Sequence, residues 1–230
     1  MSGAGFRSLR GLARRGLFAG CSLAALVGGA GPAEAAAQVF EYAIEFPVLG
    51  TIGHYVNRID RNGDAVTVTS TMRVLVEVAG VALYREDADR VERWRGDRLV
   101  QFDGVTTVNG EAAPVHGVAA GDRFVITSAN GTRSAPGDLR PTNPWSPAFL
   151  RATTIFAVNT GTFEPSRISG GEPETVSAEG RQQAVRCYRA ESRRVRARLC
   201  FAEDGVPVVM SIYAHGADIV LRLVRRGERA

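Results

Sequence analysis

Residues 66–78, VTVTSTMRVLVEV, decide the fold class because apolar and polar side chains alternate along them. The apolar parity consists of Val66, Val68, Met72, Val74, Val76 and Val78. The polar parity consists of Thr67, Thr69, Thr71, Arg73 and Glu77. A period of two buries one face of a strand and exposes the other, whereas a helix requires a period near 3.6. The stretch therefore predicts a long antiparallel strand in a curved sheet with one solvated face.

Further strand-like stretches lie on both sides of this one, separated by turn signals such as Asn62-Gly63, Asn109-Gly110 and Asp204-Gly205. They cover residues 40–46, 53–59, 81–94, 99–108, 123–128, 163–168, 174–178, 184–190, 195–202, 208–214 and 219–224. Residues 169–173, SGGEP, are predicted to form a turn. This spacing predicts a mainly β domain over residues 36–230, with one large antiparallel sheet rolled into an open or half-barrel.

The stretch TNPWSPAFLR, residues 142–151, interrupts the β pattern. Asn143 or Ser146 can cap a helix, and Pro147 suits the first helical position. The apolar positions Ala148, Phe149, Ala152 and Ile155 or Phe156 approximate a helical stripe. We therefore expect one short helix, packed against the concave face of the sheet, which Trp145 and Phe149 would help to cover.

The first 35 residues have the features of an export signal. Four arginines precede an apolar run over residues 16–30, and Ala33-x-Ala35 follows as a cleavage pattern. These arginines are Arg7, Arg10, Arg14 and Arg15. A signal peptide over residues 1–35 predicts a periplasmic protein with no transmembrane span after cleavage.

Two alternatives concern the same segment. Arg14-Arg15 loosely matches a twin-arginine signal, which would export a folded chain. Cys21 ends a sequence similar to a lipobox, so a lipid-anchored protein is the alternative location.

The charge of the chain is concentrated in this signal. All 28 basic residues are arginines, and the formal net charge is +4. Removal of the four signal arginines and Glu34 lowers it to about +1. A nucleic-acid partner is therefore not expected.

Cys187 and Cys200 are the cysteines that remain after signal cleavage. An even pair in an oxidising compartment predicts a disulfide, and two buried thiols are the alternative. In a hairpin this pairing would place Tyr188 opposite Leu199 and centre the turn on Arg193-Arg194, which is poor turn chemistry.

Six stretches occur in an order that resembles domain of unknown function 6134, a family of exported bacterial proteins. They are GTIGHY (50–55), ERWRGDRL (92–99), TTVNGE (106–111), WSPAFL (145–150), VNTGT (158–162) and CFAEDGVPV (200–208). Members typically have Trp-Asn-Pro in place of Trp145-Ser146-Pro147, and an aromatic pair in place of Cys200-Phe201. The resemblance implies export and a fold similar to open-barrel proteins that hold lipids or acyl chains.

Motifs for catalysis and for metal or cofactor binding are absent from the sequence. His54, His116 and His215 are far apart, and neither Cys-x-x-Cys nor Gly-x-Ser-x-Gly occurs. No catalytic residue, metal ligand or cofactor is therefore predicted. Residues 85–93, REDADRVER, alternate in charge, which is typical of a solvated strand edge. A carboxylate pair for acid–base chemistry is the alternative.

Two sets of residues are candidates for binding. Five aromatic side chains can line an apolar cavity or form a packed core: Tyr84, Trp94, Trp145, Phe149 and Phe156. Four arginines can form an anion-binding face on adjacent strands: Arg186, Arg194, Arg196 and Arg198.

The leading functional prediction is a non-enzymatic periplasmic binder or carrier of a hydrophobic ligand, such as a lipid or acyl chain. One alternative is a non-enzymatic envelope assembly or interaction protein that binds a partner through the arginine face or a sheet edge. A carboxylate-based hydrolase is the third hypothesis.

Overall fold

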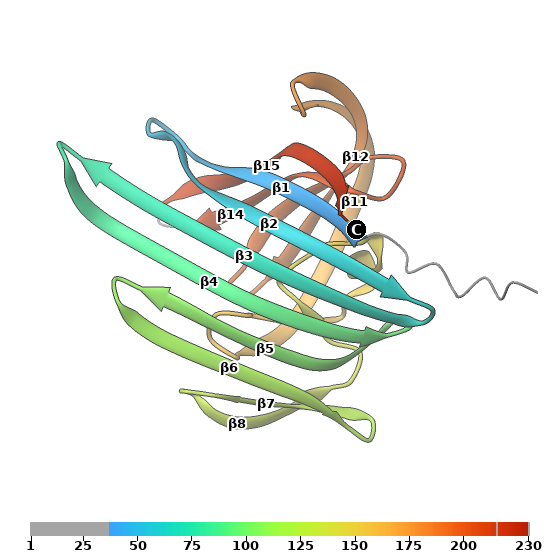
Figure 1. Ribbon diagram of the computed structural model, residues 1–230. Coiled ribbons are helices and arrows are strands. Elements are labelled where there is room, and N and C mark those ends of the chain that lie inside the picture. Colours follow the sequence, from blue (N-terminus) through green and yellow to red (C-terminus); the bar gives the residue numbers. More distant parts are fainter. Residues whose placement is uncertain (1–36, 215, 230) are drawn as a thin grey trace, which may run out of the picture. The chain divides into compact units, whose positions relative to one another are not determined.

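The computed structural model describes residues 37–214 and 216–229, which form a long series of β-strands (Figure 1). The signal peptide predicted over residues 1–35, including Cys21, lies outside the described residues. No helix in the described part of the chain has the length and apolar character needed to cross a bilayer.

The first eight strands are β1 (Ala37–Phe46), β2 (Gly50–Asn62), β3 (Ala65–Val78), β4 (Val81–Arg95), β5 (Arg98–Val108), β6 (Glu111–Ala120), β7 (Arg123–Ser128) and β8 (Gly131–Pro136). A central segment follows with β9 (Arg140–Pro141), the 3₁₀-helix η1 (Pro147–Arg151) and β10 (Thr154–Phe156). The last strands are β11 (Phe163–Ala178), β12 (Arg181–Ser192), β13 (Arg196–Phe201), β14 (Pro207–Ala214) and β15 (Ala217–Arg229).

Within these residues all fifteen strands belong to one sheet. Its order runs from β8 down to β1, then from β15 down to β9. The first and last strands therefore pair, with Ile44 opposite Leu221, while β8 and β9 form the two ends of the sheet. All neighbouring strands are antiparallel except β9 and β10. The prediction of one large, curved and unclosed antiparallel sheet is confirmed.

The alternation along β3 sets the inner face of the sheet. Val68, Ser70 and Met72 point inwards, opposite Glu92, Arg90 and Ala88 of β4. The inward positions of the other strands supply a continuous apolar core. Its largest fully buried side chains include Tyr42, Phe102, Phe124, Phe156 and Leu223. The opposite parity of β3 is partly exposed, as the sequence predicts.

Strand β6 was not predicted, because its alanine, glycine and proline residues do not show the alternation of apolar and polar side chains. Pro114 would interrupt a strand paired on both sides, since it lacks a backbone N–H. It pairs with Val105 of β5, but the pairing of β6 with β7 begins only at Val115. The missing donor therefore costs the sheet no hydrogen bond to β7. The short strands β8, β9 and β10 were likewise not predicted.

The turn predicted over residues 169–173 is wrong, because β11 continues through it. Gly170 and Gly171 form a bulge with φ values of +100° and +108°, which other residues rarely adopt. A Cβ atom on Gly171 would lie 3.0 Å from the ring of Tyr188. The two glycines therefore bend a single long strand.

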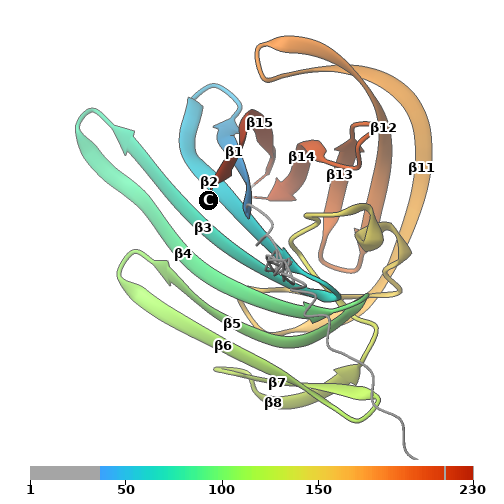
Figure 2. The same ribbon diagram turned by 45° about the vertical axis from the view of Figure 1, so that its right-hand side comes forward.

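The predicted helix is present but shorter than its apolar stripe. Pro147 occupies the first turn of η1, and Ser146 is the N-cap residue, although its side chain makes no capping hydrogen bond. Ile155 and Phe156 belong to β10 instead, because the β-branched residues before them favour extended backbone. The helix lies between the two halves of the curved sheet, with Phe149 buried (Figure 2).

Cys187 and Cys200 form the predicted disulfide across β12 and β13. The register is the expected one, with Tyr188 opposite Leu199. The hydroxyl of Ser192 makes the arginine-rich turn feasible, because it accepts hydrogen bonds from the backbone amides of Arg194 and Val195. Ser192 also donates to the carboxylate of Glu164 at 2.7 Å.

Reduction of this disulfide should lower the free energy of unfolding by roughly 2–4 kcal/mol, because it closes a short loop in the unfolded chain. Urea unfolding of the purified protein, with and without dithiothreitol, measures the change. The double variant Cys187→Ser, Cys200→Ser should unfold at the urea midpoint of the reduced wild type, and dithiothreitol should not change that midpoint. Equal midpoints for the oxidised and reduced wild type would contradict this assignment.

Candidate ligand-binding site

A partly open cavity of about 550 Å³ lies on the concave side of the sheet. This volume lies within the range of ordinary small-molecule sites. Its walls come from β1–β4 on one side and from β12–β15 on the other, with residues 142–144 and Phe149 between them. Most lining side chains are apolar, and they include Ile44, Met72, Val74, Leu199, Met210 and Leu221.

Charged side chains are rare in this lining. Among the described residues around the cavity, only Glu86 and Arg90 carry charge, and both extend from β4. The hydroxyl of Tyr84 donates to Glu86 at 2.5 Å. Besides Tyr84, the neutral polar residues in the lining are Tyr55, Thr142, Asn143 and Asn159.

A buried carboxylate organises the polar groups next to the cavity. Glu92 is fully buried and accepts hydrogen bonds from the Asn143 amide at 2.9 Å and from the indoles of Trp94 and Trp145 at 2.9 and 3.1 Å. These bonds attach the segment that precedes η1 to strand β4. They explain why a tryptophan stands between two prolines at this point of the chain.

Asn143 extends the same network across the inner face. Its amide nitrogen also donates to Ser70 at 3.1 Å, and Ser70 donates to Asn57 at 2.7 Å. The oxygen of Asn143 accepts hydrogen bonds from Tyr55 at 2.8 Å and from Asn57 at 3.1 Å. The buried polar groups of this network thereby satisfy one another.

Burial raises the pKa of Glu92 to about 7, although the N–H donors and the nearby charge of Arg90 favour the ionised form. Burial likewise raises the pKa of Tyr55 to about 12, so its hydroxyl stays protonated and acts as a donor. The network therefore contains one carboxyl group that titrates near neutral pH.

Arg90 lies beside this network, with its side chain only 8% exposed. Among the described residues its guanidinium donates one hydrogen bond, from Nη2 to Thr106 at 3.2 Å, and its buried Nε has no partner there. Gly104 stands opposite Arg90 in β5, and a Cβ atom there would lie 2.9 Å from the ring of Phe102 and 3.2 Å from Cγ of Arg90. A glycine at this position gives the arginine stem room on the inner face.

The predicted aromatic residues fall into three environments. Tyr84 and Phe149 line the large cavity. Trp94 and Trp145 are not among its lining residues; they contact each other edge to face with centroids 5.8 Å apart and bind Glu92. Phe156 is completely buried and packs against Phe102 at 4.9 Å between ring centroids.

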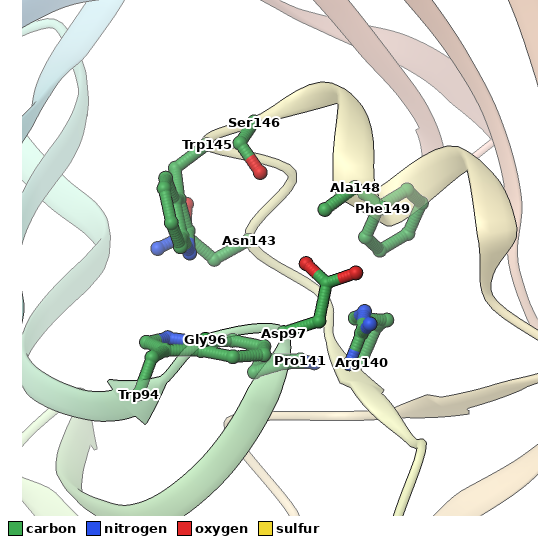
Figure 3. A pocket seen from close by; sticks show the side chains of 10 residues that line it. All are labelled: Trp94, Gly96, Asp97, Arg140, Pro141, Asn143, Trp145, Ser146, Ala148 and Phe149. Carbon is green, nitrogen blue, oxygen red and sulfur yellow. The ribbon is translucent and has the colours of Figure 1, made fainter. Parts of the chain in front are cut away.

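The two tryptophans belong to a second, much smaller pocket of about 40 Å³ (Figure 3). Trp145 and Phe149 lie on opposite sides of it, and the guanidinium of Arg140 lies 5.3 Å from the Trp94 ring centre. Such a volume has room for water rather than for an organic ligand.

The strand register places the predicted arginines of β12 and β13 on different faces of the sheet, so the four arginines do not form one shared face. Arg196 and Arg198 share the face of Cys200, whereas Arg186 pairs with Phe201 on the other face. Arg198 forms an ion pair with Glu174 at 2.5 Å, and Arg196 lies 4.4 Å above the ring of Tyr213. Arg186 donates to the Gly171 carbonyl at 2.8 Å. Arg194 lies in the turn before β13.

The acidic stretch 85–93 lies in the interior of the sheet and not at its edge, contrary to expectation. Its outward residues form ion pairs with neighbours, as Arg73 does with Asp89 at 2.8 Å. Its inward residues Arg90 and Glu92 are the functional candidates that the sequence pattern did not identify. The sequence did contain one signal: Glu92 and Arg90 lie two and four residues from Trp94, so all three side chains share one face of β4. In the described residues, no group of three or more histidine, cysteine or acidic side chains is placed to hold a metal ion.

The raised pKa of Glu92 predicts how stability changes with pH. Its folded value of about 7 exceeds the ordinary 4.5, so the folded protein binds this proton more tightly than the unfolded chain does. The stabilisation of the folded protein by this bound proton is complete below pH 4.5 and is lost as pH rises through 7. The total change should be about 3 kcal/mol.

Urea unfolding between pH 4.5 and pH 8 measures this contribution by comparing wild type with Glu92→Gln, which has no proton to lose at this position. The difference in unfolding free energy between the two should shrink or reverse as pH rises. The control Glu77→Gln removes an exposed carboxylate outside the network. Its unfolding free energy should change with pH as that of wild type does. A difference that is constant over the whole range would refute the assignment.

The fold has a relative among solved structures. A crystal structure of a β-barrel-like protein of domain of unknown function DUF1849 from Brucella abortus superposes with a TM-score of 0.63 at 11% sequence identity. The match covers 85% of this chain and 99% of the other. At this identity the likeness concerns the fold alone. No curated protein sequence matches the chain.

The sequence itself matches a family model described as domain of unknown function DUF6134 over residues 50–224. The matched region runs from the start of β2 into β15, and so includes the Glu92 network, the disulfide and most of the cavity walls, but not β1. The chain belongs to the DUF6134 family.

Proposed function

We propose that this protein is a periplasmic binder or carrier of a hydrophobic ligand, such as a lipid or acyl chain, and that it acts without catalysing a reaction. The observation that carries the proposal is the cavity of about 550 Å³ with predominantly apolar walls. Protein interiors are normally packed to the density of organic crystals, with few voids larger than a water molecule. A cavity of this size on the concave side of a sheet therefore suits an apolar occupant.

Apolar side chains continue from the cavity onto the hairpin ends. Leu49, in the β1–β2 turn, both lines the cavity and is about half exposed, and the neighbouring Val48 is fully exposed. Val81 and Leu83, at the start of β4, are also exposed. Exposed apolar groups of this kind commonly mark binding surfaces. These side chains would give an apolar ligand a surface to contact as it enters between the hairpins.

The interaction hypothesis receives less support from the geometry. A shared anion-binding face would require the arginines to lie together and unpaired. Instead, Arg186 and Arg198 occupy opposite faces, and Arg198 is already paired with Glu174. An envelope partner bound through these arginines is therefore not the function we propose.

Partial filling of the cavity should weaken ligand binding. Ala197 lines the cavity on β13, so Ala197→Trp places an indole in the space that the ligand needs. Titration with the uncharged fluorophore N-phenyl-1-naphthylamine should show saturable binding to wild type and an affinity lowered about tenfold or more in the variant, since a blocked apolar contact of 1–2 kcal/mol has this effect.

Ala184→Trp is the matched control, because Ala184 is an exposed residue of β12 that does not line the cavity. It should retain the wild-type affinity. Wild-type protein that binds neither this fluorophore nor any lipid in native mass spectra after delipidation would exclude the proposed function.

A further inference from the structure

We propose that the ligand is a single-chain amphiphile with a carboxylate head, such as a long-chain fatty acid, and that Arg90 binds this head inside the cavity. This inference rests on the proposed function and deepens it, because it adds a head-group chemistry and an orientation to an otherwise apolar ligand. It depends on the placement of Arg90 among the cavity residues.

Arg90 is a buried cation that forms no ion pair in the described part of the chain, although its charge acts on the nearby Glu92. It lines the cavity, is 8% exposed, and forms no ion pair with any described carboxylate. A guanidinium in such a place normally has a carboxylate partner, because a desolvated and uncompensated charge is costly. The single hydrogen bond to Thr106 leaves the buried Nε–H without an acceptor.

Glu92, a buried acid two residues further along β4, does not form an ion pair or a hydrogen bond with Arg90. Both carboxylate oxygens of Glu92 accept hydrogen bonds from Asn143, Trp94 and Trp145, and none comes from Arg90. Burial also raises the pKa of Glu92 to about 7, so near neutral pH this group is partly uncharged. Arg90 therefore retains positive charge that an incoming anion can neutralise.

The position of the two charged lining residues gives the ligand a direction. Glu86 lies four residues before Arg90 on β4, nearer the β3–β4 hairpin end, which corresponds to about 13 Å along a strand. Its carboxylate disfavours a second anion at that level. A bound carboxylate therefore belongs at Arg90, next to the polar groups Tyr55 and Asn143, and the alkyl chain extends along the apolar walls towards the hairpin ends.

A carboxylate fits this site better than a phosphate does. The planar guanidinium matches the two oxygens of a carboxylate, and one such pair cancels one charge. A phosphate monoester carries close to two negative charges at neutral pH and would need a second cation. In the described lining of the cavity, Arg90 is the one cationic side chain.

Displacement of N-phenyl-1-naphthylamine tests the head group with three ligands of equal chain length: palmitate, hexadecanol and hexadecyl phosphate. Wild type should bind palmitate at least about tenfold more tightly than hexadecanol, as expected for a charge-assisted hydrogen-bonded pair. Hexadecyl phosphate should bind no more tightly than palmitate.

Two variants and a control assign the effect to Arg90. Arg90→Met keeps the length of the side chain and removes the charge, so palmitate should bind about tenfold to a hundredfold more weakly while hexadecanol is unchanged. Arg90→Lys keeps the charge without the planar fork and should recover part of the preference. Arg93→Met removes an arginine on the outer face of the same strand, where it pairs with Asp103, and should behave as wild type.

The outcomes separate the two proposals. If the fluorophore, hexadecanol and palmitate all fail to bind wild type, the proposed function itself is wrong. If hexadecanol binds as tightly as palmitate, or if Arg90→Met weakens both equally, the cavity binds apolar ligands but the head-group assignment is wrong. Tighter binding of hexadecyl phosphate than of palmitate would overturn the choice of carboxylate. Retained hexadecanol binding shows that Arg90→Met is folded.

Discussion

The hydrogen bonds between Glu92 and the segment 143–145 are the constraint on which the interior of this protein depends. Asn143 and Trp145 come from a segment between β9 and η1, and both donate to one buried carboxylate on β4. An open, curved sheet offers no unique position for a segment on its concave side, because apolar contacts alone are not directional. The directional bonds to Glu92 specify that position. The part of the interior that the segment does not fill becomes the cavity.

This arrangement divides the interior into two chemical environments. Around Glu92, polar groups from β2, β3 and β4 satisfy one another, as Asn57 and Ser70 do with Asn143. Beyond them the walls are aliphatic, formed by residues such as Met72 and Leu199. Arg90 stands at the boundary of the two environments. The amphiphile that we propose as the ligand has the same division within one molecule.

The sequence predicted the strands wherever apolar and polar side chains alternate, as along β3. This alternation can be recognised in the sequence without knowledge of the tertiary structure. It did not predict β6, whose alanines and Pro114 lack β propensity and are held by their neighbours. Nor did it identify the site. Along β4 both parities carry charged residues, so Arg90 and Glu92 resemble their solvated neighbours. Glu92 is distinguished by its hydrogen bond with Asn143, 51 residues later, and this contact follows only from the completed fold.

The pairing of β1 with β15 has a consequence for how the protein folds. Ile44 and Leu221 become neighbours only when almost the whole described chain is available, so this domain has contacts of very high sequence separation. Proteins of this kind fold slowly, since a large loop must close before the last strand adds its hydrogen bonds. Until then β1 presents an unpaired edge on which chains can aggregate. A chain that is synthesised from its N-terminus therefore keeps this edge of β1 unpaired until its last strand is available.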